Sequence, residues 1–341
     1  MMQNPTMTRR TEYKLDIWAV LLLLPFLALP FVTTNPFELS LAHQIVIGLI
    51  AGLGVYIMLR MDLLAFTVPA FMAIGGYAAA MLAKNGTANL LALMAIAFVV
   101  PALVAIPLGA LVLRLKGTYF IFMTYIVNEV LQLLFFETPA LTGGSDGISG
   151  VPPAALFGYE LWSPRNLLLV TVTVGIVAAG ITLAVTHRFR PEFSSIEENE
   201  TLAESLGVAV WKYRTIGFIA SAGVSGLAGF ALVNQLSTAH PSSFASFSAI
   251  NYIAFVFIGG RRTMLGALIG AVLLISMSNA FSSQAAQYSA GLFGVLLLAV
   301  IMIAPGGLVG LGQQWLAKLR PGRASAPEGP ADPAPARREP A

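Results

Sequence analysis

One apolar stretch, residues 117–136, carries polar side chains that could handle a polar solute. Glu129 lies near its middle, and at about 100° per residue the other polar side chains fall within one arc of roughly 100°. These residues are Thr118, Tyr125, Asn128, Glu129 and Gln132. A carboxylate at bilayer depth costs at least about 2.5–3.5 kcal/mol, so it should face protein or water. We interpret the stripe as lining a pathway; the alternative is a structural network in which Asn128 and Gln132 bind a protonated Glu129.

A glycine-rich run could in principle cradle an anion. It consists of Thr142, Gly143, Gly144, Ser145, Asp146 and Gly147. No Gly-Lys-Ser/Thr follows, and the run is expected on the outer face, which excludes a P-loop for ATP. The composition is instead typical of a tight, ordered turn between membrane spans.

Residues 187–213 form the longest internal segment expected in the cytoplasm. Plotted as one helix over 196–207, Glu197, Glu200 and Glu204 form an acidic stripe, an apolar arc lies elsewhere, and Gly207 supplies a stop. This pattern predicts a short amphipathic helix that transmits force from a cytosolic partner. The alternative is a helix lying on the membrane surface, but anionic lipid prefers a basic face to an acidic one.

Other chemistry is missing from the sequence. It contains no cysteine, which excludes disulfides, thiolate catalysis and zinc–cysteine sites. The three histidines are scattered, no cluster has metal-ligand spacing, and no nucleophile has a nearby base. We therefore expect neither a metal, a cofactor nor an enzyme active site. An ATP-driven process would need separate subunits to bind ATP and Mg²⁺.

The composition places these segments in a membrane protein. Hydrophobic residues make up 57% of the chain and charged residues 10%, whereas a soluble domain carries about 25% charged residues. Strand-type alternation is absent, which argues against a membrane β-barrel. The predicted fold class is an all-α, polytopic helix bundle.

About ten transmembrane helices, within a range of eight to ten, are expected from stretches of roughly 20 apolar residues. The stretches are 16–34, 41–59, 63–83, 89–113, 117–136, 166–186, 214–236, 244–260, 263–281 and 288–312. The segment 244–260 is the shortest and is a candidate for a half-helix or re-entrant piece.

The positions of the basic residues predict the orientation. With the N-terminus in the cytoplasm, 17 of the 19 Lys and Arg residues fall on the cytoplasmic side, and only Lys84 and Arg165 fall outside. Both termini are therefore expected in the cytoplasm, and the net charge of +3 is no evidence for a nucleic-acid partner. The first apolar run has no small-residue cleavage site, so we interpret it as an uncleaved span.

The chain divides into three parts. Residues 1–15 are expected to form a cytoplasmic N-terminal segment and residues 16–312 the membrane domain. Residues 313–341 are expected to form a disordered cytoplasmic tail, because from Pro321 onward no apolar residue is larger than alanine.

Small residues at four-residue spacing predict close helix contacts rather than ligand sites. They are Ser221, Ser225 and Gly229, the pair Gly266 and Gly270, and the pair Gly48 and Gly52.

Several motifs between about residue 70 and residue 312 resemble the LivH/LivM-type permeases of bacterial ABC importers for branched-chain amino acids, closer to the LivM half. The motifs are Phe71-Met72-Ala73-Ile74-Gly75-Gly76-Tyr77, Lys116-Gly117-Thr118-Tyr119-Phe120 with Asn128-Glu129, Leu141-Thr142-Gly143-Gly144-Ser145-Asp146-Gly147, Glu198-Asn199-Glu200 with Ala203 and Gly207, and the closing Ala304-Pro305-Gly306-Gly307-Leu308-Val309-Gly310. The run 141–147 is the most specific.

Three segments depart from the family pattern. Leu59-Arg60-Met61-Asp62-Leu63-Leu64 replaces a Gly-Leu-Ser-Gly run, Glu197 replaces the Arg of Arg-Glu-Asn-Glu, and Gly259-Gly260-Arg261-Arg262-Thr263 replaces Gly-Gly-x-Gly-Thr.

The resemblance implies a multi-pass permease subunit in the bacterial inner membrane that itself binds no cofactor. Implied partners are a LivH-like second permease, two cytosolic ATPases that bind ATP and Mg²⁺, and a periplasmic amino-acid-binding protein. The implied ATPase-coupling residues within 187–213 are Glu197, Glu198, Asn199, Glu200, Ala203 and Gly207. Two alternatives stay open. One is a permease of the same family for urea, short amides or other amino acids. The other is an ion-coupled secondary transporter, which would more often carry several charges inside its spans.

Overall fold

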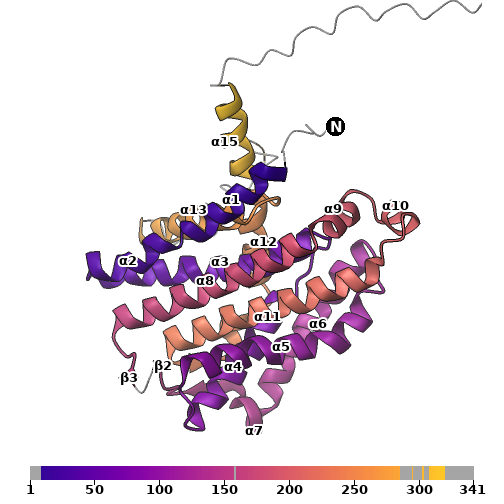
Figure 1. The fold of residues 1–341 in the computed structure, drawn as a ribbon. Helices are drawn as coiled ribbons and strands as arrows, with labels where there is room; N and C mark the ends of the chain where they lie inside the picture. The colour runs from indigo at the N-terminus through magenta and orange to yellow at the C-terminus, as the bar shows by residue number, and fades with distance from the viewer. Residues whose placement is uncertain (1–8, 157–158, 285–293, 295–301, 303–306, 319–341) are drawn as a thin grey trace, which may run out of the picture.

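The computed structural model describes residues 9–156, 159–284, 294, 302 and 307–318. Within that part of the chain, eight helical segments are long and apolar enough to cross a membrane, and α4 (Val68–Lys84) is a shorter apolar helix. The long helices run side by side in a tilted bundle, with short elements at its two ends (Figure 1). The predicted polytopic all-α fold is confirmed.

The remaining bundle helices are α1 (Arg9–Leu21), α2 (Leu24–Val32), α3 (Pro36–Leu59), α5 (Leu90–Val112), α6 (Thr118–Glu137), α8 (Pro164–Arg188), α11 (Val210–Leu236), α12 (Ser248–Gly259) and α13 (Met264–Gln284). The short elements are α7 (Pro139–Thr142), η1 (Gly144–Asp146), β1 (Ile148–Ser149), β2 (Ala155–Leu156), β3 (Tyr159–Glu160), α9 (Arg190–Glu198), α10 (Glu200–Ser205), β4 (Thr238–Ala239), η2 (Pro241–Phe244) and α15 (Gly307–Lys318).

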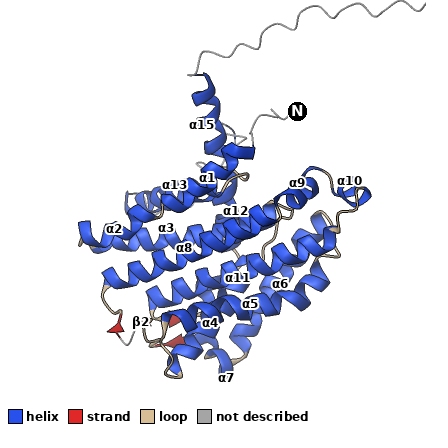
Figure 2. Cartoon of the chain, in the orientation of Figure 1, coloured by secondary structure: helices blue, strands red, loops and turns tan. Residues whose placement is uncertain are grey.

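The two ends of the bundle differ in their loops. We call one the basic end; it holds the connections 60–67, 113–117, 189–209 and 260–263. The other, which we call the glycine-loop end, holds 85–89, 138–163 and 237–247. The small strands that Figure 2 marks in red belong to the glycine-loop end, where β1 pairs with β4 and β2 pairs with β3.

The predicted first span, 16–34, is found as Leu15–Val32, with a turn at residues 22–23 between α1 and α2. Pro25 has no N–H to bond back into the preceding turn, which favours this break. Two other predicted boundaries differ from the structure. Helix α3 starts at Pro36 rather than at position 41. Asn35 caps it there, because its side chain accepts a hydrogen bond from the Phe37 N–H at 3.1 Å. Helix α4 starts later than position 63, because Asp62 has a φ of +55° and turns the chain out of the helix.

The C-terminal spans differ from the prediction in another way. Helix α12 has 12 residues, which at about 1.5 Å per residue is shorter than a bilayer core of about 30 Å. It crosses this thickness only together with η2, as the segment Pro241–Gly259. The predicted span 288–312 lies mostly outside the described residues. Helix α15 continues through residues 313–318, which were expected in the tail; residues 1–8 and 319–341 lie outside the described residues.

Helix α11 forms the centre of the bundle. It contacts α3, α4, α5 and α8, and 83% of its most apolar window is buried, against 89% for α3. The Ser221 hydroxyl donates to the Gly54 carbonyl at 2.7 Å. A Cβ at Gly226 would collide with the Ala97 carbonyl, and one at Gly229 with the Met72 carbonyl. The small residues therefore allow close backbone contact, as predicted.

The other two small-residue pairs also pack helices together. A Cβ at Gly266 or Gly270 would meet a backbone carbonyl near α12, and one at Gly48 would meet side chains of α12 and α13. The prediction of helix contacts is thus confirmed for all three sets. Helix α6 is the contrast, since only 22% of its apolar window is buried.

Gly229→Leu should destabilise the bundle, because the Met72 backbone cannot move away from the added side chain. Overpacking a core costs about 1–3 kcal/mol, and contact with backbone places the expected loss near the upper value. Thermal unfolding of the detergent-purified protein measures it. The control is Gly180→Leu on the exposed face of α8, where a Cβ meets nothing within 4 Å. Equal melting temperatures for both variants would contradict the packing argument.

Candidate functional site

The polar stripe of α6 lies across the boundary between buried and exposed surface. Thr118, Tyr125 and Glu129 are exposed, Gln132 is half-buried, and Asn128 is buried with 1% exposure. A helix positions an arc of roughly 100° as one unit, so one edge of the arc turns into the bundle and the other away from it. The residues predicted to share one surface therefore divide into an exposed group and a group that is buried or half-buried.

Glu129 belongs to the exposed part. Its carboxylate lies near the Tyr125 hydroxyl, and the Tyr125 ring packs edge-to-face against Phe66 at 6.0 Å between centroids. Most of its exposed neighbours are large and apolar. We define the α6 face as Tyr119, Phe122, Tyr125, Ile126, Glu129, Val130 and Leu133. A carboxylate in the middle of a spanning helix is too costly to leave against lipid, so this face requires a cover of protein or water.

In the structural alternative, Asn128 and Gln132 would hydrogen-bond to Glu129. Their side chains have other surroundings. The Gln132 Oε1 accepts from the Ser246 hydroxyl at 2.9 Å and from its N–H at 3.3 Å. The Asn128 Nδ2 is buried without a hydrogen-bond partner. Gln132 thus ties α6 to the loop before α12, and neither amide satisfies Glu129.

The glycine run at 142–147 is the tight turn that its composition predicts. Thr142 is buried, and its hydroxyl donates to the carbonyls of Phe135 at 2.6 Å and Thr138 at 2.8 Å. Gly143, Gly144 and Gly147 all have positive φ, which L side chains rarely adopt. A Cβ at Gly147 would also collide with the Ala239 carbonyl, where β1 pairs with β4.

Of this run, Ser145 and Asp146 are the residues with exposed side chains. The turn therefore holds the connection after α6 against the connection after α11. It presents two polar side chains at the glycine-loop end.

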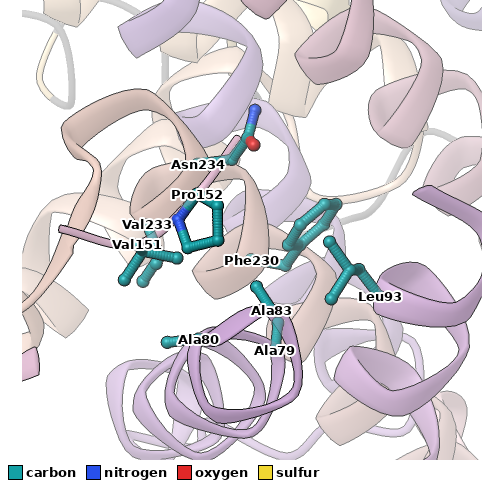
Figure 3. A pocket seen from close by; sticks show the side chains of 9 residues that line it. All are labelled: Ala79, Ala80, Ala83, Leu93, Val151, Pro152, Phe230, Val233 and Asn234. Carbon is teal, nitrogen blue, oxygen red and sulfur yellow. The ribbon is translucent and has the colours of Figure 1, made fainter. Parts of the chain in front are cut away.

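A small apolar pocket lies close to this turn, between α4, α5, α11 and residues 151–152 (Figure 3). Asn234 is the polar side chain in its lining, and its Oδ1 accepts from the Ala154 N–H at 3.0 Å. None of the lining residues belongs to α6. Its asparagine fixes the long connection between α7 and α8, so we assign the pocket a structural role.

The segment 187–213 contains two helices rather than the single one predicted over 196–207. Asn199 separates α9 from α10 with extended backbone, at φ −163° and ψ 109°, and its side chain caps α10 by accepting from the Leu202 N–H at 3.0 Å. Asparagine favours this capping position over a helix interior. Gly207 has a φ of +86° and follows the end of α10, as predicted for a stop.

The break changes which side chains face outward. Phe193, Ile196 and Ala203 are buried against the bundle. Leu202 and Leu206 are 58% and 74% exposed. Of the predicted acidic stripe, only Glu204 is exposed, because Glu197 and Glu200 turn inward. The outward face of α10 therefore presents Leu202, with Leu206 just after the helix, among the polar side chains of Thr201, Glu204 and Ser205.

Glu200 connects α10 to two other elements at the basic end. Its carboxylate forms a bidentate pair with Arg214 at 3.0 and 3.1 Å, and it binds the Lys116 ammonium at 2.8 Å. Burial of Glu200 opposes its ionisation, but the Lys116 hydrogen bond and the Arg214 charge outweigh that effect and lower its pKa. The hydrogen bond to Glu200 and the negative charge of Glu200 in turn raise the pKa of Lys116. Lys116 directly precedes α6, so this ion pair joins α10 to the helix that carries Glu129.

Glu197 connects α9 to two further loops. It binds Arg60 at 3.0 Å and Arg261 at 3.7 Å. Arg60 also donates to the Ser194 hydroxyl at 3.3 Å. The side chains of Arg60 and Glu197 are 7% and 12% exposed, so this pair is largely withdrawn from water.

Sequence reasoning missed the basic partners and one buried acid. Arg60, Lys116, Arg214 and Arg261 served there only as indicators of orientation, since sequence spacing does not reveal ion pairs between different connections of the bundle. Asp16 was placed at a span edge, yet it is 3% exposed. Its carboxylate contacts His187 at 3.1 Å and accepts from the Met264 N–H at 2.8 Å, which joins α1 to α8 and to the start of α13.

Comparison with known proteins identifies the family. The family model described as "Branched-chain amino acid transport system / permease component" matches residues 38–305. The high-affinity branched-chain amino acid transport system permease protein LivM of Salmonella typhimurium is 26% identical over 336 residues, covering 91% of this chain and 78% of that protein. LivM of Escherichia coli gives the same identity and coverage.

A third relative is a probable branched-chain amino acid transport permease protein LivH of Methanocaldococcus jannaschii. It is 27% identical over 171 residues, which cover 47% of this chain and 54% of that protein. No solved structure matches the chain significantly. The family model covers most of the bundle, from α3 to the residues before α15. The chain therefore belongs to the family of branched-chain amino acid transport permease components, and it is of the LivM type.

Proposed function

We propose that this permease moves branched-chain amino acids across the bacterial inner membrane as one subunit of an ABC importer. The observation that carries the proposal is the family match over residues 38–305, joined to an exposed carboxylate on a spanning helix. In this proposal the chain does no covalent chemistry, and separate ATPases bind ATP and Mg²⁺. Among the described residues, no group of three potential metal ligands gathers in one place.

The α6 face is where we place the pathway and the second permease. Its large apolar side chains suit contact with another helix, whereas Glu129 needs water or a polar partner. A LivH-like subunit covering this face would enclose Glu129 between the two permeases. Similarity to LivM and to a LivH protein supports such a pair, because related subunits can pack in a pseudo-symmetric arrangement. Glu129 and Tyr125 would then meet the ammonium group of a passing amino acid.

The basic end is the end that we place in the cytoplasm. The loops and helix termini there carry Arg60, Arg114, Lys116, Arg188, Arg190, Lys212, Arg214, Arg261 and Arg262. Only Lys84 and Arg165 belong to the glycine-loop end of the described residues. This asymmetry supports a cytoplasmic basic end, with the periplasmic binding protein meeting the glycine-loop end. It also supports the layout of a permease domain over 16–312 with cytoplasmic segments before and after it.

We place the ATPase at α10. Leu202 and Leu206 project from a hydrophilic loop outside the spans, where no lipid tail covers them. Exposed apolar side chains of this kind mark protein contacts more often than free surface. Buried Ala203 seats α10 on the bundle, and the ion pairs of Glu200 hold it there.

The substrate class is tested on the complex of this chain with its second permease, ATPases and binding protein in proteoliposomes. ATP-dependent uptake of leucine, isoleucine and valine is expected, with no uptake when ATP is replaced by a non-hydrolysable analogue. Urea and short amides serve as competing substrates. Preferential uptake of these compounds would reassign the substrate, and uptake driven by an ion gradient without ATP would contradict the importer class.

Glu129→Gln should lower the uptake rate by about tenfold, because an uncharged amide loses roughly 1.4 kcal/mol of interaction with a cationic group in the pathway. Protein level and membrane insertion should not change, since Glu129 makes no contact in the core. The control is Glu137→Gln, an exposed carboxylate at the far end of the same helix. Unchanged uptake in Glu129→Gln at equal expression would remove Glu129 from the pathway.

Leu206→Asp should reduce co-purification of the ATPases by at least about tenfold, because it places a charge in an apolar contact. The permease itself should fold normally, since Leu206 is 74% exposed. Leu141→Asp is the matched control; that leucine is 64% exposed but belongs to the glycine-loop end. ATPase binding that survives Leu206→Asp would place the docking surface elsewhere.

A further inference from the structure

Three stretches of sequence meet at the Glu197 carboxylate. They are the loop after α3, which supplies Arg60, the helix α9 itself, and the turn between α12 and α13, which supplies Arg261. Arg60, Glu197 and Arg261 lie far apart in the sequence, so one carboxylate joins three separate segments at the basic end.

The geometry fixes α9 in a way that its apolar contacts do not. Phe193 and Ile196 bury the inner face of α9, but apolar contact is non-directional and tolerates sliding. The Arg60 guanidinium is directional, since one nitrogen binds Glu197 at 3.0 Å and the other binds Ser194 at 3.3 Å. Both α9 side chains are thereby held by one group anchored at the end of α3.

The low exposure of this pair makes it sensitive to loss of either partner. Removing one charge from a largely buried ion pair leaves the other without compensation, whereas an exposed pair contributes little. Arg261 is 38% exposed and 3.7 Å from the second carboxylate oxygen, so it is the weaker of the two partners. Arg60 is therefore the main anchor.

We propose that Glu197 is a positioning residue of the transport cycle. Its ion pairs with Arg60 and Arg261 hold α9 against the end of α3 and against the α12–α13 turn. Movement of α9 is therefore transmitted to α3, α12 and α13. This inference rests on the proposed function, since an ATPase must move the segment. It assigns α9 a route separate from that of α10, which Glu200 ties to α11 and to the start of α6.

The first experiment compares Glu197→Gln with Asp62→Asn in the reconstituted complex. Asp62 is an exposed carboxylate in the same loop as Arg60. Glu197→Gln should lower the number of amino acids imported per ATP hydrolysed by about fivefold or more, with the ATPases still bound and active. Asp62→Asn should match the wild type. A normal ratio in Glu197→Gln would overturn the proposal.

The second experiment replaces the ion pair by a covalent link. The chain contains no cysteine, so Arg60→Cys with Glu197→Cys creates one addressable pair within this subunit. A reversible bifunctional methanethiosulfonate linker should restore the coupling ratio to within about twofold of wild type, and reductant should abolish it again. A monofunctional methanethiosulfonate controls for thiol modification. A linked protein that remains uncoupled would contradict the positioning role.

The two experiments also separate folding from positioning. If Glu197→Gln fails to assemble, recovery on linking still supports the proposal, and failure to recover overturns it. A wild-type complex without ATP-dependent uptake would contradict the proposed function itself. An active wild type beside a normally coupled Glu197→Gln variant would contradict only the role of Glu197.

Discussion

Close backbone contact at α11 is the constraint on which the rest of the bundle depends. In a membrane, helices gain no hydrophobic force by leaving lipid, so they associate through close packing and a few hydrogen bonds. Gly226 and Gly229 let the carbonyls of α5 and α4 reach the α11 backbone, and Ser221 bonds to α3. No larger side chain fits at Gly226 or Gly229 in this centre. We therefore place the proposed functional side chains on α6 and at the ends of the helices.

The elements on which we place functional side chains are loosely packed. Helix α6 is mostly exposed, and α9 and α10 lie outside the spans. Segments with few buried contacts are the ones that can move at low free-energy cost, whereas α3 and α11 supply a rigid frame. Ion pairs at the basic end connect the two classes of element. These ion pairs are directional, whereas apolar contacts are not. At least one side chain of each pair remains partly accessible to water.

Much of the architecture was predictable because a spanning helix has a strong local signature. Hydropathy predicted the helices, and the spacing of small residues predicted the contacts of α11 and α13. The glycine-rich run predicted the turn after α6. Helix starts at Pro36 and Val68 and the break at Pro25 were missed, because capping and proline effects act over single residues. The polar stripe of α6 was predicted, but not that Asn128 is buried and Glu129 exposed, because the burial of each residue depends on the neighbouring helices. Ion pairs such as Arg60 with Glu197 bridge distant segments, and a single sequence does not record them.

The extended backbone at Asn199 divides the loop 189–209 into two units that are held in different ways. Helix α9 is held by side chains of its own subunit, so a substitution at Glu197 also affects Arg60 and Arg261. Leu202 and Leu206, by contrast, are exposed and take no part in the ion pairs of the bundle. Under the ATPase docking proposed above, substitutions at these two positions would alter the contact with the partner while the ion pairs of α9 stay in place.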